Sequence, residues 1–235
     1  MKESEAAFQD GLQNVKAYFK HLELTGDTFL TRPKAEPAVL PAAVSKAGLT
    51  SLREEVITCI KCDELAKSRK SVVFGSGNPK AQLVFVGEAP GFDEDEQGLP
   101  FVGKAGQLLT KIVEAMGFER SDVFICNVLK CRPPGNRNPL PDEILNCKPY
   151  LTAQLQAIRP KVICALGNFA AQVLLKSELS ISELRGKFYE VEGMKIMPTF
   201  HPAYLLRNPA EKRKVWADMQ LIMKELGLPA SPQHE

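Results

Sequence analysis

The sequence predicts an α/β fold in which a largely parallel sheet lies between layers of helices. Short apolar runs, typical of buried strands, alternate along the chain with longer segments whose apolar residues recur at helical spacing. This alternation favours parallel strands joined by crossover helices. The chain has 235 residues, of which 44% are hydrophobic and 25% charged. That balance is ordinary for a globular protein and supplies one sizeable core.

The first 48 residues are predicted to be an extension and a linker ahead of the main domain. Residues 4–22 carry apolar side chains at helical spacing, which predicts a helix. Residues 25–48 hold Pro33, Pro37 and Pro41 among Ala, Thr and Lys, a composition typical of a linker. We therefore expect an N-terminal helical extension at 1–24, a linker at 25–48, a main domain at 49–228 and a C-terminal tail at 229–235.

The elements of the main domain follow from apolar patterning and from residues that begin or end helices. Ser51 with Glu54 predicts a capping box at the start of a helix that leads to Cys59. An amphipathic helix at 104–116 is expected to end at Gly117. The other predicted elements are strands at 82–86, 122–129 and 161–166, a helix opened by Pro141, a helix capped by Asn168, a hairpin of 188–191 with 195–199, and a last helix from about 209 to 226.

Net charge and apolar runs exclude some classes of protein. The net charge of +2 is too small to indicate a nucleic-acid partner by itself. The start of the chain is acidic and lacks the apolar region of a secretory signal. No apolar run approaches the length that crosses a membrane. We expect a soluble cytoplasmic protein that acts as a monomer and has no membrane partner.

Polar motifs follow the predicted strands at the points where the strands end. A Gly-rich segment begins at Gly87, Asn127 lies near the end of the second strand, Gly167-Asn168 follows the third strand, and His201 follows the last strand. In an open α/β sheet, ligands bind outside the carboxyl ends of the strands. Segments that are distant in sequence are therefore expected to meet at one catalytic cleft. The Gly-rich segment matches neither G-x-G-x-x-G nor the P-loop, which argues against a nucleotide-binding loop.

Four of the six cysteines have a spacing that indicates a metal site. Cys59 and Cys62 form a C-x-x-C pair at a helix end among lysines, which favour thiolates. Cys131 follows a predicted strand and Cys147 lies in the next helix, so both can face that pair. Four thiolates suit zinc or a [4Fe–4S] cluster, and the spacing favours iron–sulfur without deciding between them. The other two cysteines, Cys126 and Cys164, lie inside apolar strands and are expected to be small buried hydrophobes.

Three further motifs occur in order along the chain: GEAPGFDEDEQGLPFVGKAG at 87–106, NVLKCRPP at 127–134 and HPAYLLR at 201–207. They resemble the motifs of the family 4 uracil-DNA glycosylases, the iron–sulfur branch of the uracil-DNA glycosylase superfamily. All four cysteines also occupy the family's positions, and the resemblance covers roughly residues 50–226. It implies a three-layer α/β/α fold with a central four-stranded parallel sheet, a 4Fe-4S cluster, and uracil-containing DNA, single- or double-stranded, as partner.

The resemblance also implies roles for individual residues in the base pocket. Uracil is flipped out of the DNA and its Watson–Crick edge is read. Asn127 can accept from N3–H and donate to O4 of uracil, whereas cytosine reverses both groups. Phe101 is expected to stack on the base, with Gly87 and Ala89 beside it. His201 is expected to donate to O2, where negative charge grows as the glycosidic bond breaks.

Residues that position water and bind DNA are less well defined by the resemblance. Ala89 stands where some relatives of the superfamily place a water-activating Asp. The candidates for positioning the water are Glu88, Glu94, Asp95 and Asn136. On the DNA side, Leu205 or Leu206 is a candidate wedge, and Arg207 is a candidate phosphate ligand. Residues 132–141 contain no His, which argues against covalent trapping of the DNA.

Other functions stay open at this point. The main alternative is a non-catalytic iron–sulfur module that recognises uracil or damaged DNA. An iron–sulfur electron carrier leaves Asn127, Phe101 and His201 without a role. A zinc-stabilised nucleotide hydrolase predicts activity on free nucleotides and a colourless protein.

Overall fold

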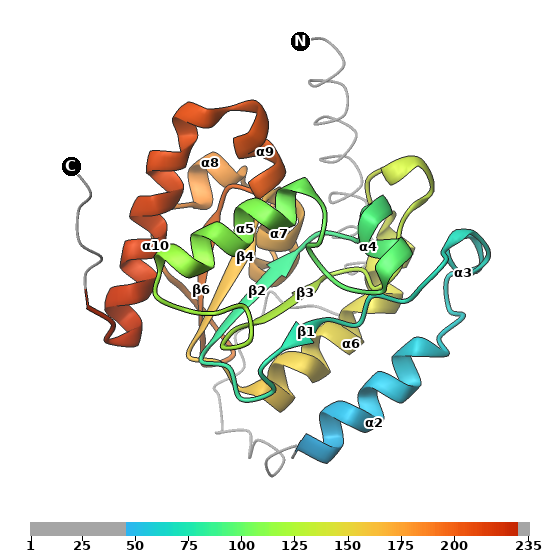
Figure 1. Ribbon diagram of the computed structural model, residues 1–235. Helices are drawn as coiled ribbons and strands as arrows, with labels where there is room; N and C mark the ends of the chain where they lie inside the picture. The colour runs from blue at the N-terminus through green and yellow to red at the C-terminus, as the bar shows by residue number, and fades with distance from the viewer. Residues whose placement is uncertain (1–45, 230–235) are drawn as a thin grey trace.

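The computed structural model describes residues 46–229, which form a six-stranded sheet with helices on both faces (Figure 1). The strand order is β1-β3-β2-β4-β6-β5. The four central strands β3, β2, β4 and β6 are parallel, and the edge strands β1 and β5 are antiparallel to their neighbours. The predicted four-stranded parallel sheet is thus confirmed, with one short antiparallel strand added at each edge. The strands are β1 Ser76–Gly77, β2 Leu83–Gly87, β3 Phe124–Asn127, β4 Val162–Leu166, β5 Tyr189–Val191 and β6 Met194–Thr199.

Two apolar clusters, one on each face of the sheet, make the fold three-layered. Val84 and Val86 of β2 pack with residues of α2, α6 and α7, whereas Leu83 and Phe85 pack with residues of α5 and α10. Because successive strand residues face opposite sides, a strand buried on both sides is apolar throughout. The helices are α2 Lys46–Ile57, α3 Asp63–Ser68, α4 Phe92–Gln97, α5 Lys104–Ala115, α6 Pro141–Ile158, α7 Asn168–Leu175, α8 Ile181–Leu184, α9 Pro202–Arg207 and α10 Lys212–Leu226, with 3₁₀ turns at Pro134–Asn136 and Pro209–Glu211.

Two predicted helix starts are wrong. Helix α2 begins at Lys46, so Ser51 lies inside the helix and cannot cap it. Gly167, and not Asn168, is the N-cap of α7, with a φ of 88° that favours glycine. The side-chain oxygen of Asn168 instead accepts a hydrogen bond from the backbone amide of Ile181 over 2.9 Å. Asn168 therefore ties α7 to α8.

The predicted extension, most of the linker and nearly all of the C-terminal tail lie outside the described residues. The end of the predicted linker overlaps α2, which begins three residues before the expected domain start at 49. Across the described range, no helix has both the length and the apolar character needed to cross a membrane.

Candidate active site

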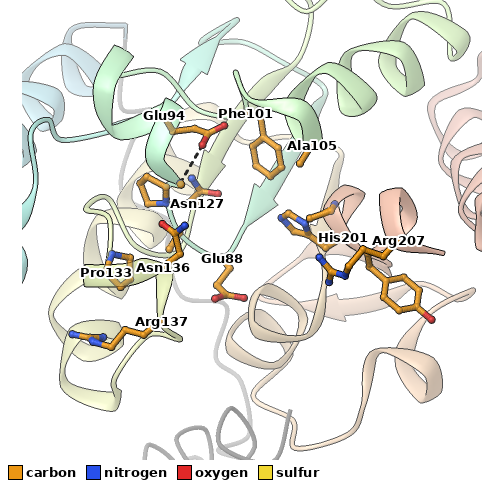
Figure 2. A pocket seen from close by; sticks show the side chains of 15 residues that line it. Glu88, Glu94, Phe101, Ala105, Asn127, Pro133, Asn136, Arg137, His201 and Arg207 are labelled. Atoms are coloured by element: carbon orange, nitrogen blue, oxygen red, sulfur yellow. Dashed lines mark hydrogen bonds between the residues drawn. The ribbon is translucent and has the colours of Figure 1, made fainter. Parts of the chain in front are cut away.

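Three of the four strand-end motifs converge on one pocket, as the sequence predicts, whereas Gly167-Asn168 is not among the residues that line it. The cavity has a volume of about 530 Å³ and lies at the carboxyl ends of β2, β3 and β6. Figure 2 shows its arrangement: Pro133 and Asn136 form one wall, His201 and Arg207 form the other, and Glu88 points into the space between them. Residues from four separate segments therefore share one site.

Asn127 ends strand β3 and presents an unpartnered acceptor to this pocket. The residue is only 1% exposed, and its Oδ1 has no hydrogen-bond partner in the structure. A Cβ atom at Gly87 would lie 2.4 Å from Oδ1 and 2.7 Å from the ring of Phe101. Glycine is therefore required for the carboxamide and the ring to approach β2. A buried acceptor without a partner is costly, which indicates that a ligand supplies the donor.

A buried lysine fixes the backbone of Asn127 through a hydrogen bond. Lys130 Nζ donates to the backbone oxygen of Asn127 over 2.7 Å and to Gln154 Oε1 over 2.6 Å. Gln154 in turn donates from Nε2 to the backbone oxygen of Phe74 over 2.8 Å. Burial lowers the pKa of Lys130. Sequence reasoning missed this network, although a lysine inside the apolar run NVLKC was a signal for it.

Phe101 covers one side of the pocket in an unusual backbone conformation. Its φ is 53°, in the left-handed region, and its ring centroid lies 5.5 Å from that of His201. Helix α5 approaches the backbone of Phe101 so closely that a Cβ at Gly106 would lie 1.9 Å from its carbonyl oxygen. This glycine therefore permits the contact that holds Phe101 over the site.

The imidazole of His201 is held as a neutral hydrogen-bond donor. The backbone amide of Ala203 donates to His201 Nδ1 over 3.1 Å at the start of α9. Because Nδ1 accepts, the proton of the neutral ring lies on Nε2. Burial lowers the pKa of His201 to about 4, and the positive charge of Arg207 adds to the shift. His201 is therefore uncharged near neutral pH and keeps an N–H to donate.

A second buried network, also missed by sequence reasoning, fixes the end of β6 just before His201. Thr199 Oγ1 donates to Asp218 Oδ2 over 2.6 Å. Arg185 Nη2 donates to Asp218 Oδ1 over 2.7 Å, and its Nε donates to Oδ2 over 3.2 Å. These bonds join β6 to α10 and to the end of α8, and so hold the strand from which His201 emerges.

Two of the four residues expected to position water have structural tasks instead. Glu94 accepts backbone N–H bonds from Gly91, Val102 and Gly103 over 3.2, 2.9 and 3.0 Å, so its carboxylate holds the Gly-rich loop together. Asp95 is buried outside the pocket lining and accepts from the amides of Lys70 and Ser71. Asp95 therefore does not face the pocket, whereas Glu94 lines the pocket with a carboxylate that already accepts from three backbone amides.

Glu88 and Asn136 are the other two candidates, and both line the pocket. Burial raises the pKa of Glu88 to about 7. A carboxyl with this pKa changes its protonation state close to neutral pH, as a general base does. Asn136 Oδ1 already accepts from Arg132 Nε over 2.7 Å. Glu88 is therefore the better placed of the two to accept a proton from water.

The two leucines of α9 face opposite environments. Leu205 is 1% exposed and packs in the core with α5 and α10, so it cannot insert into DNA. Leu206 is 46% exposed. Arg207 ends the helix and lines the pocket. Leu205 is therefore excluded as the wedge. Leu206 stays the candidate wedge, and Arg207 stays the candidate phosphate ligand.

Comparison with known proteins agrees with this geometry. The family model described as the uracil DNA glycosylase superfamily matches residues 74–220. This chain belongs to that superfamily. Its similarity extends over most of the length of several relatives named type-4 uracil-DNA glycosylase. They include the protein of Archaeoglobus fulgidus (47% identical, covering 74% of this chain and 91% of the relative), that of Saccharolobus solfataricus (47%, 76% and 86%) and that of Thermotoga maritima (48%, 66% and 81%). The chain is thus a member of the type-4 family.

The four cysteines of this superfamily member lie on three segments and interact electrostatically with one another. Cys59 and Cys62 lie between α2 and α3, Cys131 lies after β3, and Cys147 lies within α6. All four are free thiols. Burial raises the pKa of Cys147 to about 12, with smaller contributions from the charges of Cys131 and Cys62. The other two cysteines, Cys126 and Cys164, are fully buried in β3 and β4, as the sequence predicts.

Nitrogen donors point at three of the four sulfurs. Such N–H groups stabilise thiolates whether or not a metal is bound. Within the described residues, no three His, Cys, Asp or Glu side chains are placed to hold a metal ion together. Four cysteine sulfurs with N–H donors beside three of them nevertheless match the chemistry of an iron–sulfur site, and the cluster itself is a proposal. The contacts are Arg69 Nη1 to Cys131 Sγ at 3.0 Å, Asn146 Nδ2 to Cys62 Sγ at 3.6 Å and Lys130 N to Cys147 Sγ at 3.3 Å.

Proposed function

We propose that this chain is a DNA repair glycosylase that hydrolyses the N-glycosidic bond of deoxyuridine in DNA. The products are free uracil and an abasic site. One observation carries the proposal: the buried, unpartnered carboxamide oxygen of Asn127 shares a pocket with the neutral N–H donor of His201. Uracil has one donor, N3–H, between two acceptors, O2 and O4. Asn127 and His201 offer the complement.

The base is selected by Asn127 and Phe101. A flipped uracil offers N3–H to Asn127 Oδ1 and accepts at O4 from the amide nitrogen of the same side chain. Cytosine presents an acceptor and a donor at these positions and so meets two mismatches. Leaving buried polar groups unpaired in this way rejects the wrong base strongly. The ring of Phe101 supplies the stacking surface that replaces the neighbouring bases.

The bond is broken with help from His201 and Glu88. As the C1′–N1 bond breaks, its electron pair leaves with uracil, and negative charge grows on O2. The Nε2–H of His201 donates to O2 without needing a proton from solution, because the ring is already neutral. Water adds to C1′, and the proton that it loses passes to Glu88. The pKa of Glu88 near 7 suits that acceptor role.

We propose that Cys59, Cys62, Cys131 and Cys147 hold a 4Fe-4S cluster. The support is the electrostatic interaction of these free thiols with one another and the N–H donors from Arg69, Lys130 and Asn146. A cluster in this place cross-links three segments of the chain and contributes folding free energy. The base-reading and proton-transfer steps assigned above need no redox partner.

DNA is the substrate of the superfamily to which the chain belongs, and we propose that its uracil is the target here. Leu206 fills the gap left in the DNA, and Arg207 binds a backbone phosphate. We propose that the chain acts as a monomer in the cytoplasm, where a reducing environment keeps cysteine thiols available as metal ligands.

The test is incubation of the purified full chain with a uracil-containing oligonucleotide, followed by alkali. Strand cleavage at the former uracil, together with free uracil in solution, supports the proposal. The main alternative is a non-catalytic module that binds uracil or damaged DNA. It predicts binding to the same oligonucleotide with no free uracil and no cleavage.

A further inference from the structure

Phe92 is an exposed aromatic side chain beside the pocket. It is the first residue of α4 and follows the Gly-rich segment 87–91 directly. It is 56% exposed, and among the residues whose burial is described it is the one aromatic side chain in the exposed class. Burying a phenylalanine side chain stabilises a fold, so packing in the core does not explain why Phe92 is exposed.

Arg132 connects Phe92 to the pocket wall. The Arg132 guanidinium carbon lies over the Phe92 ring, 5.1 Å from its centroid, in a cation–π contact. Arg132 Nε also donates to Asn136 Oδ1 over 2.7 Å, and Asn136 lines the pocket. The ring is therefore held at the edge of the wall formed by Pro133 and Asn136, with a positive charge beside it.

The opposite wall carries a similar pair, Leu206 and Arg207, on α9. Figure 2 shows Arg207 across the pocket from Asn136. Each wall thus pairs an exposed apolar side chain with an arginine, Phe92 with Arg132 and Leu206 with Arg207. A DNA strand that places one nucleotide in the pocket must run across both walls. Its flanking nucleotides then meet Leu206 on one side and Phe92 on the other.

We propose that Phe92, held by Arg132, stacks on the base next to the flipped uridine in single-stranded DNA. This inference rests on the proposed glycosylase function and adds a strand preference to it. Aromatic side chains beside a positively charged track bind single strands because every base has a face on which to stack. An unpaired flanking base can reach Phe92 freely, whereas in a duplex the same base must first leave its partner and its stack. This stacking platform, the Phe92 ring held by Arg132, therefore favours binding of single-stranded over double-stranded DNA.

The test measures binding of the full chain to labelled single strands by fluorescence anisotropy. The central nucleotide is 2′-fluoro-deoxyuridine, whose electron-withdrawing fluorine resists cleavage of the glycosidic bond. A second strand replaces both flanking nucleotides by abasic tetrahydrofuran sites, and a duplex of the first strand is the third probe. The variants are Phe92→Ala, Phe92→Trp and, as a matched control on α10, the exposed Leu221→Ala.

Phe92→Ala should raise the Kd for the intact single strand by roughly 5- to 100-fold, the scale of losing one base–aromatic stack. The change should be small for the strand that lacks flanking bases, and smaller for the duplex than for the single strand. Phe92→Trp and Leu221→Ala should bind like the wild type. Equal loss with and without flanking bases, a larger loss on the duplex, or no loss at all would overturn the proposal.

The same proteins separate this proposal from the glycosylase function. Wild-type chain is incubated with the unmodified uracil strand, and free uracil is measured. A wild type that binds with the expected dependence on Phe92 but releases no uracil contradicts the glycosylase and leaves the stacking platform supported. If the wild type releases uracil but strand binding does not depend on Phe92, the glycosylase function is supported and the stacking role of Phe92 is overturned.

Discussion

The backbone amide of Ala203 donates a hydrogen bond to Nδ1 of His201 over 3.1 Å. This contact decides which ring nitrogen carries the proton, because the atom that accepts cannot also be protonated in the neutral ring. Burial and the charge of Arg207 lower the pKa of His201 to about 4 and so keep the ring neutral. The site therefore presents a fixed N–H toward the position where charge develops on the departing base.

Replacing His201 by alanine removes that donor. The single-turnover rate of uracil release should fall by roughly two to three orders of magnitude, the scale of losing one oxyanion donor. Binding of uracil DNA should change much less, because the interaction grows mainly in the transition state. Rapid-quench kinetics and anisotropy measure the two quantities. An unchanged rate would remove His201 from the mechanism.

The pH dependence of the reaction should report on Glu88. Because its pKa is raised to about 7, the carboxylate that accepts a proton forms as pH rises through 7. The single-turnover rate should rise with pH up to about 7 and then level off. Glu88→Gln should be slower and should lack this step. A step near pH 7 that persists in Glu88→Gln would assign it to another group.

The raised pKa of Glu88 also predicts how the stability of the fold depends on pH. The folded state holds the Glu88 proton more tightly than the unfolded chain, in which the carboxyl has its ordinary pKa of 4.5. The contribution of Glu88 to stability is therefore fully present below pH 4.5 and is lost as pH rises through about 7. Glu88→Gln should lack this decline in denaturant melts between about pH 5 and 8. His201 acts oppositely: its lowered pKa penalises the fold as pH falls from about 6.5 toward 4.

Breaking the Asp218–Arg185 pair should destabilise the fold and disturb His201. Asp218→Ala leaves the Arg185 charge half-buried and unpaired, at a cost of about 3–5 kcal/mol. For a domain of this size the melting temperature should fall by roughly 6–20 °C. The control is Glu225→Ala, which breaks the more exposed pair with Lys195 and should cost under about 1 kcal/mol. Equal melting shifts for the two variants would contradict the role assigned to the buried network.

Iron content should depend on Cys59 and not on Cys164. Purified wild type should be brown and contain about four irons per chain, as four thiolates around a cubane require. Cys59→Ala should lose iron and stability together. Cys164→Ala removes a buried thiol of β4 and should keep its iron. Stoichiometric zinc without iron in an anaerobic preparation of wild type would refute the cluster.

The long elements were predictable because their burial leaves a pattern in the sequence. Strands β2 and β4 are buried on both faces and so appear as unbroken apolar runs. Helix α5 shows a regular apolar face and ends at Ala115, two residues before Gly117. Helices α3, α4, α8 and α9 span only four to six residues each. Helices this short have too few turns to show a helical period of apolar residues in the sequence.

Other features of the site depend on partners that are distant in sequence. Leu205 and Leu206 are neighbours on one short helix, and only the packing of α9 shows which of them is buried. The polar end of the buried Lys130 side chain is accommodated because Gln154, 24 residues away, supplies an acceptor. The sequence makes Glu94 a candidate for positioning water because the backbone amides that its carboxylate binds carry no sequence signature.

Asn127 is proposed to select uracil over cytosine, and excision from matched oligonucleotides with one uracil or one cytosine measures this selection. Wild type should release uracil and no cytosine. Asn127→Asp at neutral pH sets a carboxylate against O4 of uracil, so uracil release should fall steeply. If burial raises the pKa of the new Asp, its protonated form matches cytosine, and weak cytosine release should appear at low pH. A wild-type rate on uracil in Asn127→Asp would show that Asn127 does not read the base and would contradict the account.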